Sequence, residues 1–213
     1  RGRHVLLVAR NPDKLARAKA ELGERASTAQ VDLRDPVAVQ AFVKSLDDLE
    51  HPLTQLVNAA GTFSPTPFLE HSEADYDTYM DLNRATFFVT QGAVRSMIKT
   101  GGGAIVNIGS MWAKQAIKAT PSSAYSMAKA GLHSLTQHLA MELAAHSIRV
   151  NAVSPAVVET PIYEAFIPTE QLAETLRGFD AFHPIGRIGH PQDVASVVEF
   201  LLSDDASWVT GAV

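Results

Sequence analysis

A tyrosine and a lysine lie four positions apart in the segment "SSAYSMAKAGLHSLTQHLAMEL", residues 122–143. An α-helix turns by about 100° per residue, so Tyr125 and Lys129 would project from the same face. The rest of this face consists of Leu132, Thr136, Leu139 and Leu143. An ammonium buried among such residues loses hydration worth several kcal/mol. Lys129 therefore requires a polar partner or a path to water.

Such a tyrosine and lysine pair has a chemical use in proton transfer. A phenol with an unperturbed pKa of about 10 is a poor acid or base at neutral pH. A neighbouring ammonium favours the phenolate and lowers that pKa, and each unit is worth about 1.4 kcal/mol. We therefore expect Lys129 to face a polar cleft and to lower the pKa of Tyr125. The spacing alone is a weak motif, because many helices contain it by chance.

The elements that must position this pair follow from the pattern of apolar residues. Short apolar segments, the predicted strands, cover residues 4–9, 29–33, 53–59, 104–108 and 148–153. Longer amphipathic segments, the predicted helices, cover residues 12–22, 36–49, 73–99, 122–143 and 191–203. This alternation predicts an α/β fold with a doubly wound, Rossmann-like parallel sheet. The length and the absence of a linker predict a single domain over residues 1–213.

One long irregular stretch interrupts the alternation at residues 157–189. It carries four aromatic residues between prolines and glycines, Tyr163, Phe166, Phe179 and Phe182. A loop of this kind commonly covers a binding site, although a packed surface excursion fits nearly as well. We predict that it forms a lid over a partly apolar substrate.

Composition excludes several classes of function. The net charge is −5, with 18 basic and 23 acidic residues, which argues against a nucleic-acid partner. The absence of cysteine excludes a disulfide framework and a thiolate metal site, and it suits the cytoplasm. His133 and His138 point to different sides of the predicted helix, which indicates surface or capping residues and no metal site. No apolar segment approaches the ~20 residues that span a bilayer, and no leader precedes the first strand, so we expect no membrane partner.

Polar residues recur where the predicted strands end. They are Arg10, Asp32, residues 58–61, Ser110, and Ser154 with Pro155. Any one of them could be ordinary turn chemistry. In a doubly wound sheet, however, ligands bind at the carboxyl ends of the strands. Their recurrence beside the tyrosine and lysine pair favours a binding site.

Five sequence segments carry a resemblance to a known family. They are "LVNAAG" (56–61), "YMDLNRATFF" (79–88), "AIVNIGS" (104–110), "AYSMAKAG" (124–131) and "IRVNAVSPAVVETP" (148–161). Their order and intervals resemble those of the short-chain dehydrogenase/reductase family, over nearly the whole chain. The resemblance implies an oxidoreductase that transfers a hydride between a nicotinamide cofactor and a small alcohol or ketone.

The resemblance also implies the catalytic residues. Tyr125 would be the acid/base, and Ser110 would hold the substrate carbonyl or hydroxyl. Asn83 would support a water-linked proton relay through Lys129, which would also bind the nicotinamide ribose. The stretch from Ser110 to Tyr125 is slightly longer than is usual in the family, which leaves residues 122–123 as alternative hydroxyls. We favour Ser110, because it ends a strand, whereas the two later serines resemble helix N-caps.

The cofactor-binding residues implied by the resemblance lie at the strand ends. Asn58 and Gly61 would shape the strand end beside the cofactor, and Asp32 would lie by the adenine. Pro155 belongs to this set, next to Ala156, where the family commonly has glycine. Thr160 would bind the nicotinamide carboxamide, although a cap before the next proline is equally compatible.

Arg10 bears on the choice of cofactor. A carboxylate at this strand end commonly accepts a hydrogen bond from the ribose of NAD, whereas an arginine accommodates the additional phosphate of NADP. The segment "VLLVARNP" has Arg10 and no acid there. We therefore favour NADP(H) over NAD(H), with a solvated strand-end residue as the alternative.

The chain departs from the family at both ends. Compared with the family, we expect it to be truncated by a first strand with its glycine-rich turn and by a last strand. That first strand would lie in the middle of the sheet, so the two halves would have unpaired edges. Without the turn that binds the pyrophosphate, we expect poor hydride transfer. The full-length protein should be active.

Two rival functions remain to be weighed. A serine hydrolase needs Gly-x-Ser-x-Gly, and the chain has "IGSMW" instead. A catalytically silent nucleotide-binding or structural subunit is the alternative outside catalysis. The joint presence of Asn83, Ser110, Tyr125 and Lys129 favours the enzyme. The resemblance further implies a homodimer or homotetramer that packs through helices 73–99 and 122–143. Residues expected to point outward from the second helix are Ala130, His133, Ser134, Gln137 and Met141.

Overall fold

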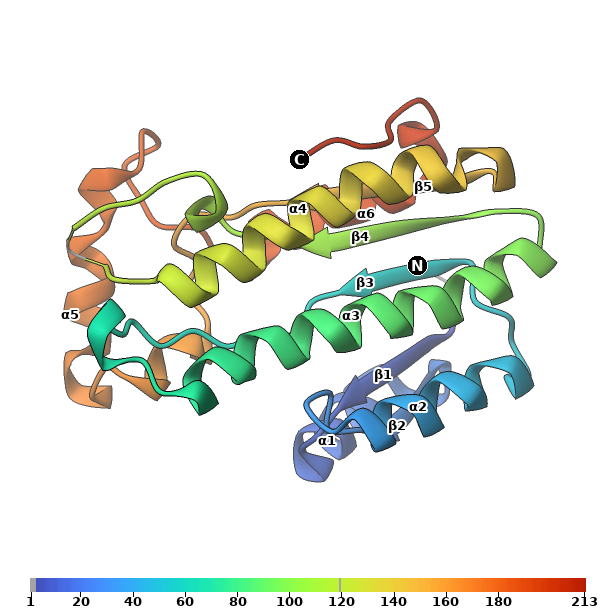
Figure 1. Ribbon diagram of the computed structural model, residues 1–213, viewed down its shortest axis with the longest axis horizontal. Helices are drawn as coiled ribbons and strands as arrows, with labels where there is room; N and C mark the ends of the chain where they lie inside the picture. The colour runs from blue at the N-terminus through green and yellow to red at the C-terminus, as the bar shows by residue number, and fades with distance from the viewer. Residues whose placement is uncertain (1–2, 119) are drawn as a thin grey trace.

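The computed structural model describes residues 3–118 and 120–213 (Figure 1). Its strands are β1 (Val5–Ala9), β2 (Ala26–Gln30), β3 (Gln55–Asn58), β4 (Gly103–Ile108) and β5 (Ile148–Val153). Its helices are α1 (Pro12–Leu22), α2 (Pro36–Ser45), α3 (Glu73–Lys99), α4 (Ser123–Leu143), α5 (Thr169–Gly178) and α6 (Pro191–Leu202). Short 3₁₀ turns connect several of them.

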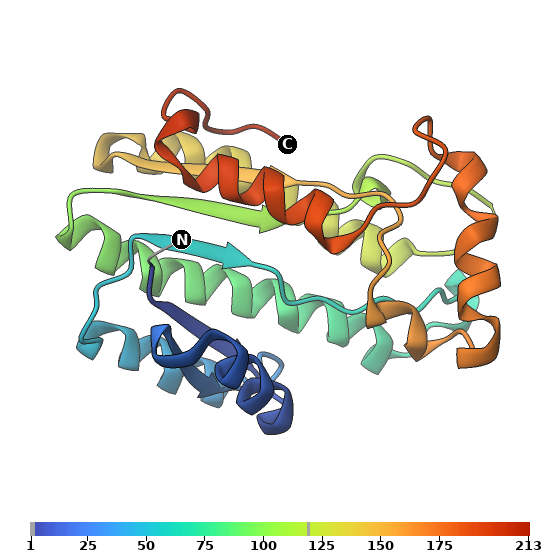
Figure 2. The same ribbon diagram turned by 180° about the vertical axis from the view of Figure 1, so that it is seen from behind.

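All strands pair in parallel, which confirms the predicted α/β class. One group is β1–β2 and the other is β3–β4–β5, with β4 in the middle. Helices α2, α3 and α4 cover one face, and α1 and α6 cover the other (Figures 1 and 2). Within residues 3–118 and 120–213 no strand pairs with both β1 and β3. The two groups are instead joined through α2, which packs along α3.

Local signals explain where the helices begin. The Asp35 side chain accepts from the backbone N–H of Val37 at 2.8 Å, and Pro36 occupies the first helical position of α2. Ser72 and Asp75 form a reciprocal capping box at the start of α3. These caps satisfy N–H groups that the first helical turn leaves without partners.

Two of the predicted boundaries are wrong. Strand β2 covers Ala26–Gln30 and not residues 29–33. Val31, which suggested a later strand, is buried after the strand end against Phe42 and Leu46. The predicted helix at residues 36–49 ends at Ser45 and continues only as a 3₁₀ turn. In both cases the apolar residues beyond the end of the element belong to one core cluster.

The stretch at residues 157–189 is not simply an irregular loop. It contains helix α5 and two 3₁₀ turns, Pro161–Ala165 and Asp180–Phe182. Backbone hydrogen bonds close its base, from Gly189 N to Val157 O at 2.9 Å and from Glu159 N to Gly189 O at 2.9 Å. Helix α5 is only 10 residues long and buries only Leu176.

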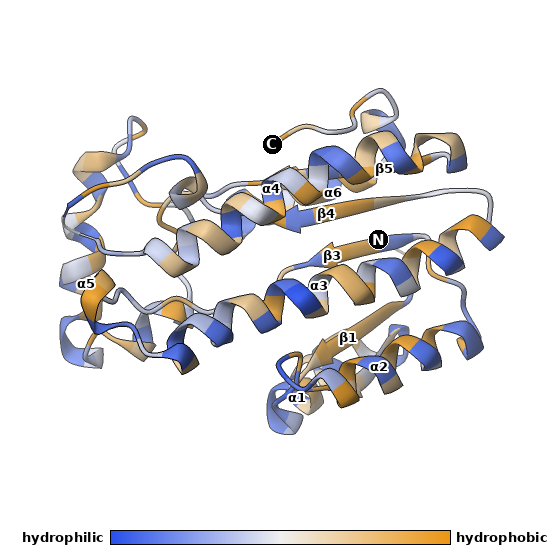
Figure 3. Ribbon diagram, viewed as in Figure 1, coloured by the Kyte–Doolittle hydropathy of each residue, from blue (hydrophilic) through white to orange (hydrophobic). Residues whose placement is uncertain are grey.

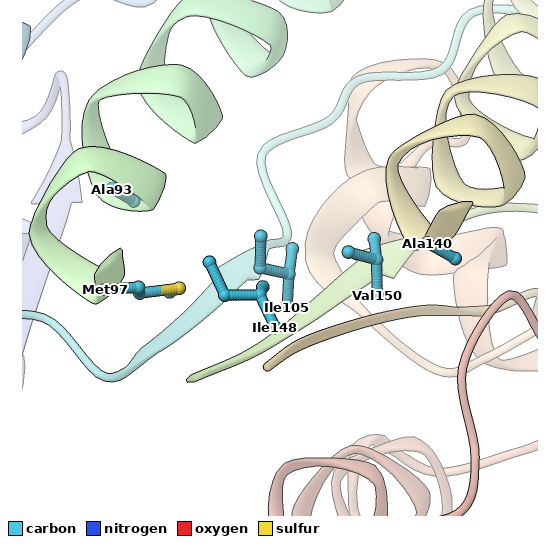
Figure 4. Packing of buried hydrophobic residues seen from close by; sticks show 6 residues of the cluster. All are labelled: Ala93, Met97, Ile105, Ala140, Ile148 and Val150. Carbon is cyan, nitrogen blue, oxygen red and sulfur yellow. The ribbon is translucent and has the colours of Figure 1, made fainter. Parts of the chain in front are cut away.

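The main core lies between the sheet and helices α3 and α4 (Figure 4). Its buried residues are Ala93, Met97, Ile105, Ala140, Ile148 and Val150. Figure 3 shows apolar residues along the strands and a mixture of both kinds on the helices. Burying such side chains contributes roughly 25 cal/mol per Å² of apolar surface. This packing holds the rigid framework on which the strand ends carry their polar residues.

Candidate active site at the strand ends

Tyr125 lies in the first turn of α4, within an aromatic cluster. Its ring packs edge to face on Phe63, with centroids 4.8 Å apart, and on Tyr79, with centroids 5.7 Å apart. The hydroxyl of Ser110 lies close enough to its phenol to lower the pKa of that phenol. The structure therefore brings together the two residues that were predicted to handle the substrate oxygen.

Ser110 lies two residues after the end of β4 and is buried. Its backbone neighbours extend the pairing of β4 with β5 past the strand ends, because Gly109 N donates to Val153 O at 2.7 Å and Met111 N donates to Pro155 O at 3.0 Å. The alternative hydroxyl of Ser122 instead forms a 3.0 Å hydrogen bond with Ser126 Oγ. The geometry favours Ser110.

Lys129 finds its polar partner at the end of β4. Its Nζ donates to the carbonyl oxygen of Ile108 at 2.7 Å and lies 5.7 Å from the centroid of the Tyr125 ring. A Cβ placed on Gly61 would lie 4.0 Å from the same Nζ, so the turn after β3 passes beside this ammonium. Burial lowers the pKa of Lys129 to about 8. Lys129 thus lies beside Tyr125, while its ammonium is hydrogen-bonded to a backbone carbonyl.

The expected lowering of the tyrosine pKa is wrong for this structure. Burial raises the pKa of Tyr125, and the hydrogen bond from Ser110 opposes that rise only in part. The phenols of Tyr163 and Tyr79 raise it further. The reason is that a buried phenolate loses hydration, while the ammonium of Lys129 is directed to the carbonyl of Ile108.

Asn83 on α3 reaches the helix that carries Lys129. Its Nδ2 donates to the carbonyl oxygen of Ala128 at 2.8 Å. A Cβ on Gly131 would lie 3.5 Å from that Nδ2, which is an ordinary van der Waals contact. The structure places Asn83 beside α4, and the proton relay stays a prediction.

Asn58 belongs to a network of polar side chains that runs from α3 across the neighbouring strands β3 and β4 to α4. Its Nδ2 donates to Thr90 Oγ1 at 2.9 Å and to Asn107 Oδ1 at 2.8 Å. Asn107 Nδ2 in turn donates to Thr136 Oγ1 at 2.9 Å. Sequence reasoning missed Thr90, Asn107 and Thr136. The position of Asn107 within the apolar strand "AIVNIG" was a signal that could have been used. This network connects α3 with β3, β4 and α4, the elements next to the candidate site.

Arg10 and Asp32 lie at the ends of β1 and β2. The strands β1, β3 and β4 point to the same side of the molecule (Figure 1). Arg10 is exposed, and its charge helps to lower the pKa of Asp32. The larger cause is the backbone N–H of Arg34, which donates to Asp32 Oδ1 at 2.9 Å.

The remaining predicted residues occupy turns. Gly61 is exposed after β3, and Pro155 follows β5. Thr160 precedes the 3₁₀ turn Pro161–Ala165, and its side chain makes no capping hydrogen bond. The capping alternative for Thr160 thus lacks its hydrogen bond.

The expectation that His133 points outward is wrong. His133 is 7% exposed, and its Nε2 lies 2.6 Å from Ser154 Oγ. It follows Lys129 by one turn of α4, and both residues face the ends of β4 and β5. The spacing of four positions from Lys129 was the signal that sequence reasoning overlooked.

These strand ends fit a nicotinamide dinucleotide. Lys129 makes one hydrogen bond within the described residues, whereas an ammonium has three donors, so it can also bind ribose hydroxyls. Gly61 adds no side chain over that ammonium, and Arg10 offers an exposed guanidinium. In the part of the chain that the structure describes, no three His, Cys, Asp or Glu residues are grouped to hold a metal. No helix there is long and apolar enough to cross a bilayer.

Comparison with known proteins places the chain among dehydrogenases and reductases. A family model described as Enoyl-(Acyl carrier protein) reductase matches residues 1–213. Galactitol 2-dehydrogenase of Rhizobium johnstonii is 41% identical over 184 residues, which cover 85% of this chain and 70% of that protein. Cis-4-hydroxycyclohexanecarboxylate dehydrogenase of Sinomonas cyclohexanicum is 36% identical, with coverage of 100% and 84%.

Solved structures agree with the sequence relatives. L-Sorbose reductase from Gluconobacter frateurii, complexed with NADPH and L-sorbose, has a TM-score of 0.87 at 30% identity, covering 98% of this chain and 83% of that one. A short chain dehydrogenase/reductase family protein has a TM-score of 0.84 at 31% identity, covering 98% and 82%. The chain belongs to the short-chain dehydrogenase/reductase family of oxidoreductases.

Proposed function

We propose that this protein transfers a hydride between NADP(H) or NAD(H) and a small alcohol or ketone, with Tyr125 as the acid/base. The observation that carries the proposal is the grouping of Ser110, Tyr125 and Lys129 at the end of β4 and the start of α4. The similar proteins are named for galactitol, a cyclic hydroxy acid and sorbose. These names support a small hydroxylated compound as the substrate.

The chain's own residues handle the proton of the reacting oxygen. When bound, the nicotinamide supplies the acceptor or donor of the hydride. As an alcohol is oxidised, its hydroxyl must lose a proton, which Tyr125 accepts, and in reduction Tyr125 returns it. Ser110 donates a hydrogen bond to the same oxygen, which is strongest when negative charge develops there.

Lys129 and Asn83 connect Tyr125 to solvent in this proposal. The ammonium of Lys129, with a pKa of about 8, can exchange a proton near neutral pH. Asn83, held against the carbonyl of Ala128, supports the water that completes the relay. Lys129 also binds the ribose hydroxyls, and Asn58, Gly61, Pro155 and Thr160 surround the nicotinamide half.

Residues 157–189 act as the substrate lid of a single dinucleotide-binding and catalytic domain. Phe166, from this segment, packs edge to face on Phe63 with centroids 5.6 Å apart. Phe63 in turn contacts the ring of Tyr125. The phenol of Tyr163, from the same segment, lies near enough to Tyr125 to raise the pKa of the Tyr125 phenol. The lid thus supplies an apolar wall that excludes water from the reacting groups.

Arg10 supports NADP(H) as the preferred cofactor, because an exposed guanidinium at the end of β1 can pair with the additional phosphate. Asp32 lies nearby, on the adenine side. A homodimer or homotetramer is supported by large apolar side chains exposed on the two long helices. They include Phe87, Phe88 and Ile98 on α3, and Met127 and Met141 on α4. We place the enzyme in the cytoplasm.

Replacing Tyr125 with phenylalanine tests the proposal in full-length protein. Galactitol, cis-4-hydroxycyclohexanecarboxylate and L-sorbose are offered with NADP(H) and with NAD(H), and turnover is followed by the absorbance of the reduced cofactor. The substitution should lower kcat by about 10³-fold, because it removes the proton donor and acceptor. The dissociation constant for the cofactor should stay within about threefold, since Lys129 remains.

Tyr76, which is exposed on α3, provides the matched control. Tyr76→Phe removes the same hydroxyl group away from the site and should leave kcat unchanged. Undiminished turnover in Tyr125→Phe would rule out the mechanism. Binding of cofactor with no turnover of any substrate in the panel would instead favour the catalytically silent subunit.

A further inference from the structure

A short backbone ribbon carries Ser110 into the site. The residue before it donates its N–H to Val153 O at 2.7 Å, and the residue after it donates to Pro155 O at 3.0 Å. Ser154 lies between these two acceptors. Any movement of Ser154 therefore displaces both hydrogen bonds that flank Ser110.

His133 holds Ser154 from the helix behind the ribbon. Its Nε2 and Ser154 Oγ share a 2.6 Å hydrogen bond, and the histidine is 7% exposed. One turn earlier on α4, Lys129 Nζ is bonded to Ile108 O at 2.7 Å. The two contacts attach α4 to the ends of both β4 and β5.

Gly109 leaves the space that this hydrogen bond occupies. A Cβ on Gly109 would lie 2.4 Å from His133 Nε2 and 2.5 Å from Ser154 Oγ. The glycine, histidine and serine therefore form an interlocked contact with no room for another atom. Burial and the charges of Lys114 and Lys129 lower the pKa of His133, which keeps the ring neutral at neutral pH.

We propose that His133 is a positioning residue, which fixes Ser154 and thereby aligns the hydroxyl of Ser110 with Tyr125. This inference rests on the proposed function for its catalytic consequence. The physical reason is that a shift of about 1 Å in a catalytic group can cost about 10²-fold in rate. The side chain of Ser110 itself is held only weakly: within the described residues its hydroxyl accepts one hydrogen bond, from Trp112 N at 3.3 Å.

Amide hydrogen exchange in His133→Leu tests the positioning directly. The N–H groups of Gly109 and Met111 should exchange about tenfold faster, because the carbonyls that accept from them are no longer fixed. His133→Gln, which can place a polar atom near the position of Nε2, should restore slow exchange. His138→Leu changes an exposed histidine of the same helix and should leave both amides unchanged.

Kinetics on full-length protein then test the catalytic consequence, with the substrate of the panel above that the unaltered enzyme turns over. His133→Leu should lower kcat about 10- to 100-fold with little change in cofactor affinity. In a Ser110→Ala background His133→Leu should lower kcat by less than about threefold, because both substitutions act through the Ser110 hydroxyl.

Several results would overturn the inference. Unchanged exchange at both amides would show that His133 does not hold the ribbon. An equal loss of kcat with and without the Ser110 hydroxyl would show that His133 acts by another route. If His133→Leu does not fold, Ser154→Ala removes the same hydrogen bond and must give the same results. Undiminished turnover in Tyr125→Phe would refute the proposed function alone, because the exchange measurement does not depend on activity.

Discussion

Lys129→Met should stabilise the protein in the absence of cofactor, although it should also abolish efficient catalysis. Burial lowers the pKa of Lys129 from 10.5 to about 8. Each tenfold change in proton affinity corresponds to about 1.4 kcal/mol, so keeping this lysine charged at pH 7 costs about 3 kcal/mol of folding free energy. Methionine fills similar space without a charge, but it leaves Ile108 O without its donor, which costs about 1 kcal/mol. The expected net gain is about 2 kcal/mol.

This gain should depend on pH in a defined direction. Below the folded pKa of about 8, Lys129 is charged in both the folded and the unfolded chain, and its full penalty is present. As the pH rises from about 8 to 10.5, the folded protein loses the proton first, so the penalty shrinks. The advantage of Lys129→Met should therefore be largest near pH 7 and nearly absent above pH 10.5.

Urea denaturation followed by tryptophan fluorescence measures the effect at pH 7 and at pH 10. At pH 7, the Tm of Lys129→Met should lie about 4–8 °C above that of the unaltered protein, for a chain of this size. Lys14→Met on the exposed side of α1 is the matched control and should show neither the gain nor its pH dependence. A variant that is no more stable at pH 7, or whose gain does not change with pH, would refute the burial argument.

Two further predictions concern the polar network and the cofactor. Asn107→Ala should lower the free energy of unfolding by about 2–4 kcal/mol, because it removes one hydrogen-bond partner from each of Asn58 and Thr136 and opens a cavity, and urea denaturation would detect it. A decrease in the free energy of unfolding below about 0.5 kcal/mol would show that this polar network is not needed for stability. Arg10→Ala should reduce the ratio of kcat/KM for NADP(H) over NAD(H) by about tenfold, as one charge-assisted contact is lost. An enzyme that already prefers NAD(H) would contradict the role assigned to Arg10.

The sequence by itself determined the features that depend on near neighbours in the chain. The alternation of apolar strands and amphipathic helices predicted the parallel α/β fold, and prolines 12, 36 and 191 marked helix starts that the structure confirms. The spacing of Tyr125 and Lys129 placed both on one side of α4, because that relation needs only the geometry of a helix. The family motifs then indicated which strand ends carry the site.

Only the tertiary structure decided features that depend on several elements at once. The burial of His133 against Ser154 requires the packing of α4 on the end of β5, and the contact of Asn58 with Asn107 requires the register of β3 and β4. The direction of the Tyr125 pKa was mispredicted for the same reason. A pair of residues gives one electrostatic interaction, whereas the pKa reflects desolvation by every group that surrounds the phenol, and those groups come from α3, the turn after β3 and the segment after β5.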